Sequence, residues 1–381
     1  MKKILMYTTS KIYTGKRITG GINRFIMLYQ GLIDKGYDVD LYCGETEETL
    51  KKYNMKAKSI DCKEKRNSKI FPNIRIMLKN LKLLLKLRKE KYNKVIVFDI
   101  PTAISICLLK FKNVNLFLRQ DLIEYRKIIL NDANKNVIYK IIYLQFMKFC
   151  EYICCKNAEK IIIQCEFDAE NLIKRHRFIR KSLQNKITIQ INNVNAKWII
   201  EKSKINVNTE NDGYFKIGFV GDFSSKRKGH DILIPVIYNM IEKNIKVKLF
   251  VIGDGKELCE YKEKYKKYEN IIFLGRMSNP MELVKKMDLV VVPSLADSCP
   301  NTVLEAMYND VLVIGTNRGG IPEIIDNKQA VFEPAIDSLE EKLIEIILNT
   351  KYKEDLKSKQ QVRKQQLTFE WEDKIIEILK N

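Results

Sequence analysis

Two carboxylates in the stretch ADSCPNTVLEAM, residues 296–307, have types and spacing that suit chemistry on a polar ligand. Asp297 and Glu305 are separated by seven residues, and the apolar run LVVVPS precedes them. The run predicts a buried strand, and the following residues predict a helix that Asn301 or Thr302 caps. The two acids could transfer protons, or they could accept hydrogen bonds from ligand hydroxyls beside the free N–H groups of the helix start. A helix cap and a good helix former would be a purely structural explanation of the same two acids.

Glycines follow several other predicted strands in the same half of the chain, and basic residues follow one of them. Arg227 and Lys228 lie between a strand exit and a predicted helix, where Lys228 could add positive charge for a diphosphate. Any one glycine loop could be an ordinary turn, but several at corresponding strand exits predict a nucleotide site, because glycine admits close backbone approach and helix N-termini attract phosphate. The glycines are Gly221, Gly253, Gly255, Gly319 and Gly320.

The elements that must position these residues alternate between short apolar strands and amphipathic helices, such as the pattern over 22–36 closed by Gly36. Strands are predicted at residues 2–9, 38–44, 94–100, 114–121, 160–165, 216–223, 247–255, 271–276, 289–294 and 311–317. The order predicts an α/β protein with two doubly wound, Rossmann-like domains facing a cleft, residues 1–205 and 206–365. The polar stretch 201–214 is the predicted linker. Ligands should bind at the carboxyl ends of the strands.

Composition narrows the class of protein. Residues 1–205 hold 42 Lys and Arg against 19 Asp and Glu, whereas residues 206–381 hold 26 against 28, so the first half should face an anionic partner. Nine scattered cysteines without a CxxC pair suit a reducing compartment, and the presence of only two histidines argues against a His-based metal site. No apolar stretch is long enough to span a membrane, and the N-terminus resembles a first strand of a cytosolic protein more than a signal peptide.

The ordered string GFVGDFSSKRKGHDILI, LFVIGDG, IIFLGR, VVVPSLADSCPNTVLEAM and VIGTNRGGIPEII resembles the C-terminal domain of retaining glycosyltransferases with the GT-B fold, namely glycosyl transferases group 1, family 4. The match is densest over 216–326. The family's pair of acids separated by seven residues aligns with Asp297 and Glu305. The resemblance implies that the C-terminal domain binds a nucleotide-diphospho-sugar, UDP- or GDP-linked, and that the basic N-terminal domain binds the acceptor.

The resemblance also implies roles for individual residues. Glu305 would hold the ribose hydroxyls, Asp297 would contact the donor sugar, and Lys228 would bind the diphosphate as the third catalytic group. Residues 366–381, with Trp371, would be a terminal helix that crosses back to the N-terminal domain. Further donor contacts are expected from Gly221, Arg227, Gly253, Arg276, Ser298, Cys299, Pro300, Asn301 and Thr302. The expected acceptor and phosphate loops comprise Gly20, Gly21, Arg119 and Asp121.

Three departures from the family pattern bear on activity. The first acid is Asp297 where the family usually has Glu, and Asp222 stands where an Arg is usual. The N-terminal His of many members is replaced by the stretch FLRQDL around Arg119. Either another polar group does the work of the His, or the chain is a non-catalytic sugar-nucleotide or partner-binding relative. A sugar-nucleotide epimerase is a further alternative on the same architecture.

By resemblance, transfer should retain the anomeric configuration. Lys228 and helix N–H groups would stabilise the leaving diphosphate, so the main effect would be electrostatic and no metal or other cofactor is expected. The acceptor is expected to be a saccharide, lipid-linked, in the assembly of a cell-surface polysaccharide such as a capsule or O-antigen. The sequence names neither the base nor the donor sugar nor the linkage.

A basic stripe in the first half suggests where an anionic surface could bind. Within residues 73–91, five basic residues recur at spacings of four, three, four and three, which forms one stripe on a single helix. The stripe could be an ordinary solvated helix face, or it could dock on anionic lipid headgroups at the inner face of the membrane. Nucleic acid is disfavoured because no aromatic platform or nucleic-acid motif accompanies the charge. The residues are Arg75, Lys79, Lys82, Lys86 and Lys89.

Overall fold

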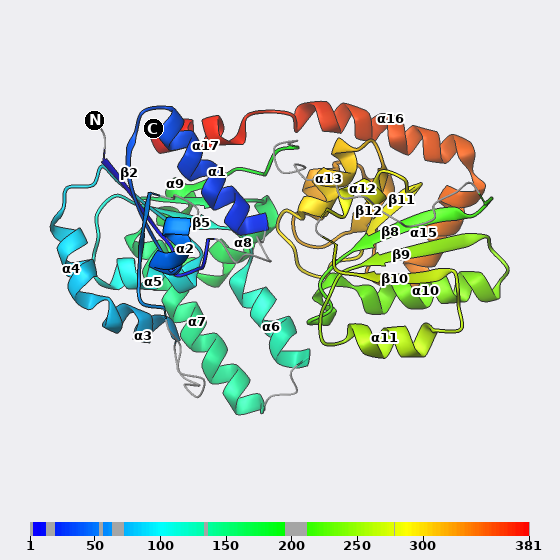
Figure 1. The fold of residues 1–381 in the computed structure, drawn as a ribbon, viewed down its shortest axis with the longest axis horizontal. Helices are drawn as coiled ribbons and strands as arrows, with labels where there is room; N and C mark the ends of the chain where they lie inside the picture. The colour runs from blue at the N-terminus through cyan, green and yellow to red at the C-terminus, as the bar shows by residue number, and fades with distance from the viewer. Residues whose placement is uncertain are drawn as a thin grey trace. The chain divides into compact units, whose positions relative to one another are not determined.

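The computed structural model describes residues 3–12, 20–52, 56–62, 72–132, 136–194, 212–277 and 279–380. These residues form two compact units, drawn in Figure 1. The first unit contains residues 1–123, 137–190 and 370–381, and the second contains residues 124–136 and 191–369. Each unit has its own hydrophobic core around its own sheet.

The first unit is built on a parallel sheet of seven strands in the order β3-β2-β1-β4-β5-β6-β7. The central strands are buried on both faces, which explains their near-continuous apolar sequences. The order reverses between β1 and β4, which makes this the topological switch point of the sheet. The strands are β1 Lys3–Tyr7, β2 Asp38–Cys43, β3 Ala57–Ser59, β4 Lys94–Phe98, β5 Val114–Leu118, β6 Lys160–Ile163 and β7 Ile187–Ile189.

Helices connect these strands, as parallel pairing requires. The helix α6, Leu122–Asp132, begins in the first unit and continues into the second. The other described helices of the first unit are α1 Gly20–Asp34, α2 Glu47–Lys52, α3 Pro72–Lys79, α4 Leu81–Lys89, α5 Ile100–Leu108, α7 Val137–Asn157, α8 Glu166–Arg175, the 3₁₀ turn η1 Arg177–Ile179, α9 Arg180–Lys186 and α17 Trp371–Lys380.

The second unit repeats the pattern with six parallel strands in the order β10-β9-β8-β11-β12-β13. Its switch point lies between β8 and β11. The strands are β8 Phe215–Val220, β9 Val247–Ile252, β10 Ile271–Gly275, β11 Leu289–Val292, β12 Leu312–Thr316 and β13 Val331–Phe332. The described helices are η2 Lys226–Lys228, α10 His230–Glu242, α11 Leu258–Tyr265, α12 Met281–Val284, α13 Asn301–Tyr308, α14 Ile321–Ile325, η3 Lys328–Ala330, α15 Ile336–Leu348 and α16 Thr350–Gln366.

All ten strands predicted from the sequence are present, and the two doubly wound sheets confirm the predicted fold class. The sequence did not predict β3, β7 and β13, which are the short outermost strands of the two sheets. An edge strand of two or three residues has too few apolar positions to produce a pattern.

The C-terminal helix α17 belongs to the first unit although the sequence just before it belongs to the second. This helix packs against α1 (Figure 1). The Arg24 guanidinium lies 5.2 Å from the centre of the Trp371 ring. Lys160 Nζ also donates a hydrogen bond to the backbone oxygen of Ile378, at 2.5 Å. The chain therefore returns to the first unit after α16, at residue 370.

The observed start of the second unit differs from the predicted division at residue 206. The unit already includes residue 191, because Val194 is buried in its core and the Val194 N–H donates to the Leu367 oxygen at 2.9 Å. Most of the predicted linker, 201–214, lies outside the described residues. Among the described residues, no helix is both long and apolar enough to cross a bilayer.

Candidate functional site

The loops after β8 and β11 leave the second sheet at its switch point and bring the basic pair to Asp297. Arg227 and Lys228 lie in the 3₁₀ turn η2 after β8, and Asp297 lies in the loop after β11. Lys228 Nζ is 2.6 Å from Asp297 Oδ2, and Arg227 Nη1 is 3.5 Å from the same oxygen. Arg227 Nη1 also donates to the Ala296 backbone oxygen at 3.0 Å. A compact cluster of two cations and one carboxylate thus lies where doubly wound sheets bind ligands.

The cluster is largely shielded from water, and this determines its charge state. The side chains of Lys228 and Asp297 are 19% and 17% exposed. Burial by itself raises the pKa of the Asp297 carboxyl, but the nearby Lys228 ammonium and Arg227 guanidinium outweigh it and hold that pKa below its usual range. Asp297 is therefore a carboxylate at neutral pH and can accept, but not donate, hydrogen bonds.

Two glycines allow the loops to meet at this cluster. Gly229 has φ of 71°, and a Cβ there would lie 1.9 Å from the Pro293 backbone oxygen. Gly319, after β12, has φ of 59°, and a Cβ there would lie 2.2 Å from the Asp297 backbone oxygen. The next residue, Gly320, donates its N–H to that same oxygen at 3.0 Å. Both positions combine a left-handed backbone with close approach, so only glycine fits without strain.

The helix α13 carries Glu305 one turn from its start, as the spacing predicted. The predicted cap is wrong: the helix begins at Asn301, the N-cap residue is Pro300, and no side chain caps it. The Asn301 amide oxygen instead accepts a weak hydrogen bond from Asn192 at 3.5 Å. Glu305, Asn301 and Thr302 lie on the half-buried face of α13, away from its core face.

The other predicted donor residues fall into two groups. Three of them, Ser298, Cys299 and Pro300, are buried in the loop after β11, and the Cys299 side chain is part of the hydrophobic core. Their burial holds the loop in its conformation. Arg276 is exposed at the carboxyl end of β10.

The remaining strand exits of the second sheet contribute backbone and a turn. Gly221 and Gly253 follow β8 and β9, and a Cβ on Gly253 would lie 1.8 Å from the Gly221 oxygen, so the two loops touch through backbone. Asp222, the departure from the family's Arg, accepts the Ser224 N–H at 2.6 Å. Asp222 therefore stabilises the turn that leads toward Lys228.

The switch point of the first sheet carries a second polar cluster, built on Asp99 and Arg119. Arg119 follows β5, and its Nε donates to Asp99 Oδ2 at 3.0 Å while its Nη2 pairs with the same oxygen. A Cβ on Gly21 would lie 1.2 Å from Arg119 Nη1, so the guanidinium lies directly against this glycine. Gly20 and Gly21 were expected in a loop, but they are the first two residues of α1.

Asp99 was missed by the sequence analysis, although it follows a buried strand. Its backbone has φ of 65° and ψ of 150°, a conformation that is strained for any residue with a Cβ. The neighbouring hydroxyls of Thr9 and Thr102 are 3.1 Å apart across the same switch point. The sequence signal was an acid directly after the apolar run KVIVF. That this acid pairs with Arg119 could be known only from the fold.

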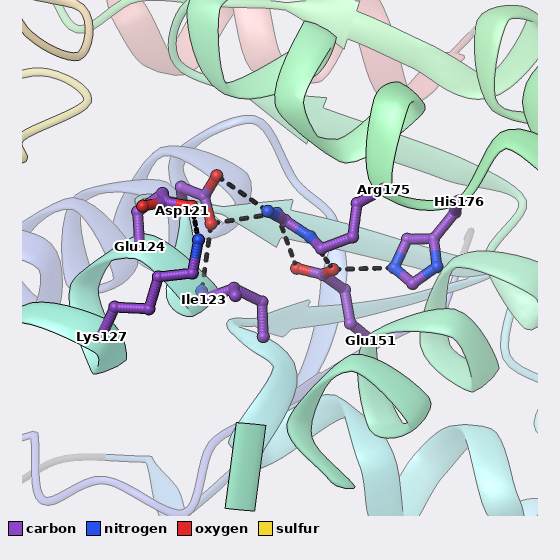
Figure 2. A network of polar contacts seen from close by, with 7 residues as sticks. All are labelled: Asp121, Ile123, Glu124, Lys127, Glu151, Arg175 and His176. Carbon is purple, nitrogen blue, oxygen red and sulfur yellow. Dashed lines mark hydrogen bonds and ion pairs between the residues drawn. The ribbon is translucent and has the colours of Figure 1, made fainter. Parts of the chain in front are cut away.

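Asp121 takes part in a different interaction from Arg119. Figure 2 shows it in a buried network in which Arg175 joins Asp121 to Glu151, and Glu151 joins His176. Arg175 Nη2 is 2.9 Å from Asp121 Oδ1, Arg175 Nε is 2.7 Å from Glu151 Oε2, and His176 Nε2 is 2.7 Å from the same Glu151 oxygen. Asp121 therefore anchors the loop after β5, which carries Arg119, to α7 and α8.

The predicted basic stripe is not on one helix. Asn80 separates α3 from α4: its side-chain amide donates to the Ile76 oxygen at 2.8 Å and its side-chain oxygen accepts the Asp61 N–H at 2.9 Å. These bonds tie Asn80 to the loop after β3 and interrupt the helix. Lys82, Lys86 and Lys89 are exposed on α4. Lys79 is exposed on α3 and paired with Asp61 at 3.4 Å, whereas Arg75 is half-buried.

The two Rossmann-like units, each with a charged cluster at its own switch point, have the GT-B fold that solved glycosyltransferases share. Residues 201–363 match the family model described as glycosyl transferases group 1.

Known proteins resemble the chain over different lengths. CapJ of Staphylococcus aureus is 30% identical over 158 residues, 40% of each chain, so the match spans less than half of that relative. An uncharacterised glycosyltransferase of Methanocaldococcus jannaschii is 28% identical over 300 residues, 75% of this chain and 70% of that one. The S. aureus capsular polysaccharide biosynthesis glycosyltransferase CapM is 27% identical over 206 residues, 50% and 53% of the two chains.

Solved structures share the fold over the whole chain. Sucrose-phosphate synthase of Thermosynechococcus elongatus superimposes with a TM-score of 0.75 at 14% identity, covering 99% of this chain and 97% of that one. HepE of Anabaena in complex with UDP-glucose gives 0.70 at 15% identity, covering 99% of both chains. At such identities the similarity establishes the fold alone.

Proposed function

We propose that this protein transfers a sugar, with retention of anomeric configuration, from a nucleotide-diphospho-sugar to a saccharide acceptor in the assembly of a cell-surface polysaccharide. The observation that carries the proposal is the Lys228–Asp297–Arg227 cluster at the switch point of the sheet that the family model matches. CapM, named for capsular polysaccharide biosynthesis, and HepE, solved with UDP-glucose, support the polysaccharide context and a nucleotide-sugar donor.

In this proposal the second unit binds the donor. Lys228, with Arg227 beside it, neutralises the diphosphate as it leaves, which is an electrostatic contribution available without covalent chemistry. The ionised Asp297 accepts hydrogen bonds from hydroxyls of the donor sugar, and Glu305 on α13 accepts them from the ribose. The acceptor hydroxyl attacks on the face from which the diphosphate departs and passes its proton to the departing phosphate. The proposal assigns no step to a metal.

The first unit would bind the acceptor, and Arg119 would supply the polar group that many family members supply as His. The Asp99 carboxylate orients the guanidinium, and the glycine at position 21 leaves room for it at the start of α1. A fixed cation there suits an anionic acceptor group such as the phosphate of a lipid-linked saccharide. The basic character of residues 1–205 favours the inner face of an anionic membrane as the place of reaction.

A thermal-shift screen against UDP- and GDP-linked sugars tests donor binding. A ligand at 100 times its dissociation constant stabilises the folded state by about 2.7 kcal/mol. A stabilisation of that size raises the melting temperature measurably. The donor that stabilises the wild type should not stabilise Lys228→Met to the same degree. With that donor, NMR of the product anomer tests the mechanism. An inverted linkage would contradict retention, and the absence of any stabilising sugar nucleotide would contradict the donor assignment.

A further inference from the structure

The part of α7 from Val137 to Phe149 exposes apolar side chains that belong to neither hydrophobic core. Val137, Ile138, Ile141, Ile142 and Phe149 are all exposed, with values between 55% and 67%. We call these five residues the α7 stripe. Surface helices normally turn polar residues outward. Several large aliphatic side chains exposed together on one short helical segment form a patch of the kind that marks an interaction site.

The helix has two apolar faces, and only one of them is covered. Met147, Cys150 and Cys154 are buried in the core of the first unit, where α7 packs against α5. Ile138, Ile142 and Phe149 recur at spacings of four and seven, so they share the opposite side of the helix. A helix that is apolar all round is normally buried all round. The exposed face of α7 therefore requires a partner that is not part of this chain's cores.

The charge around the stripe indicates what that partner is. Between Asp132 and Glu151 the sequence holds three lysines and no acidic residue. Lys140 and Lys148 lie half-buried on α7 itself. Tyr139 stacks on Tyr143 with ring centres 6.0 Å apart, at the same end of the helix. Aliphatic side chains with lysines and tyrosines nearby are the composition of a helix that lies in a membrane interface.

A second copy of the chain fits this surface less well than a lipid surface does. In a two-fold dimer the same patch would face itself, so lysines would meet lysines with no carboxylate in the segment to pair with them. Anionic headgroups supply that charge. The segment from Val137 to Phe149 is about 20 Å long, which is too short to span a bilayer and long enough to lie along it.

The basic pair α3–α4 lies beside the same part of the unit. Both α3 and α7 pack against α5 (Figure 1). Leu78 and Leu85 are also exposed, next to the exposed lysines of α4. The two helix groups together present lysines and aliphatic side chains around one shared neighbour.

We propose that the α7 stripe inserts into the boundary between headgroups and acyl chains of an anionic bilayer, with the lysines of α3 and α4 contacting headgroups beside it. The proposal rests on the proposed function in that a lipid-linked acceptor requires the enzyme at a membrane. It goes further by assigning the insertion to α7, a helix that carries none of the basic residues predicted to bind the membrane.

Co-sedimentation of the full chain with vesicles tests the proposal. Wild type should bind vesicles of phosphatidylcholine mixed with phosphatidylglycerol and bind pure phosphatidylcholine more weakly. The double variant Ile138→Asn/Ile142→Asn should lose affinity for the mixed vesicles at least about tenfold, because two aliphatic insertions are removed. The matched control Leu348→Asn/Val362→Asn changes two exposed aliphatic residues of the second unit and should bind like wild type.

A fluorescence variant reports insertion directly. Ile142→Trp should show a blue-shifted emission with mixed vesicles and quenching by brominated acyl chains. Equal vesicle binding by wild type and the Ile138/Ile142 double variant would overturn the proposal, as would failure of wild type to bind. A change from dimer to monomer in the double variant, with vesicle binding unchanged, would assign the stripe to a second copy instead.

Calorimetric titration with UDP and GDP separates this outcome from the proposed function. The stripe variants should bind nucleotide like wild type, because α7 is not part of the second unit. Vesicle binding without nucleotide binding would leave the stripe assignment standing and remove the donor assignment. Nucleotide binding without vesicle binding would do the reverse.

Discussion

The ion pair between Lys228 and Asp297 implies a competition that one substitution should reveal. Lys228 Nζ lies 2.6 Å from Asp297 Oδ2, so a diphosphate that uses this ammonium competes with the carboxylate and is repelled by its charge. Asp297→Asn removes the charge and preserves the shape of the side chain. We expect the bare nucleoside diphosphate, UDP or GDP, to bind this variant more tightly than it binds wild type.

The size of the gain follows from the burial of the pair. Two unit charges 4 Å apart interact by about 4 kcal/mol at an effective dielectric constant of about 20, whereas fully exposed pairs contribute about 0–1 kcal/mol. The side chains of Lys228 and Asp297 are 19% and 17% exposed, between these limits but nearer the buried one. After screening by the solvent that remains, about 1–2 kcal/mol is expected, which corresponds to about 5- to 30-fold in affinity.

The pH dependence has a defined sign. Although burial opposes it, Lys228 and Arg227 lower the pKa of Asp297 in the folded protein. The carboxylate therefore stabilises the fold at neutral pH, and this contribution is lost as the pH falls through the lowered pKa. The same ionisation keeps the competition in force across the ordinary Asp range. The affinity difference between wild type and Asp297→Asn should close only below that range.

Isothermal titration with UDP and GDP measures the effect directly. Asp326→Asn is the matched control, because Asp326 is also paired with an arginine of the second unit but is 66% exposed, and its affinity should equal that of wild type. Sugar transfer by Asp297→Asn should fall even as nucleotide binding tightens, since the proposed contact of the carboxylate with the donor sugar is lost. Unchanged or weaker nucleotide binding by Asp297→Asn would refute the competition.

Three further variants test the fold and the site. Arg175→Met removes the cation that two buried carboxylates, Asp121 and Glu151, share, and should lower the free energy of unfolding by about 3–5 kcal/mol in urea titration. Lys174→Met, from an exposed pair, should change it by less than about 0.5 kcal/mol, and similar values for both would contradict the role of the network. Gly229→Ala should lower the free energy of unfolding by about 2 kcal/mol or more and weaken nucleotide binding. Gly213 has a similar positive φ but open space around it, so Gly213→Ala should lower the free energy of unfolding by only about 1 kcal/mol in the same urea titration. Glu305→Ala should lose transfer activity in a donor-consumption assay at an unchanged melting temperature, because its side chain lies outside the core; full activity would remove Glu305 from the site.

The strands were predictable because the central ones are buried on both faces and are therefore short, nearly continuous apolar runs. The handedness and connection rules for parallel strands limit the possible strand orders to a few, and the structure shows which one each sheet adopts. The break of the basic helix at Asn80 was not predictable, since the helical period continues through it. The interruption comes from hydrogen bonds to Asp61, a residue remote in sequence.

The residues proposed to bind the donor could be named from the sequence alone. Asp297, Glu305 and Lys228 could be named because their spacing relative to strands and glycines is local information. Their arrangement was not readable: the 2.6 Å pairing of Lys228 with Asp297 joins residues 69 positions apart and depends on β8 lying beside β11. In the proposed acceptor site, Asp121 follows Arg119 by two positions, yet its carboxylate pairs with Arg175, which the sequence did not indicate.

The sequence by itself determined the two doubly wound sheets, the acids and cations at the strand exits of the second one, and the excess of positive charge in the first half, because these depend on local pattern and composition. Only the tertiary structure decided which charges meet. It paired Asp99 with Arg119 across one switch point and Lys228 with Asp297 across the other, and it left one apolar face of α7 uncovered. Contacts between residues far apart in the chain, and the exposure of a face, arise from how strands and helices pack, and no local pattern records them.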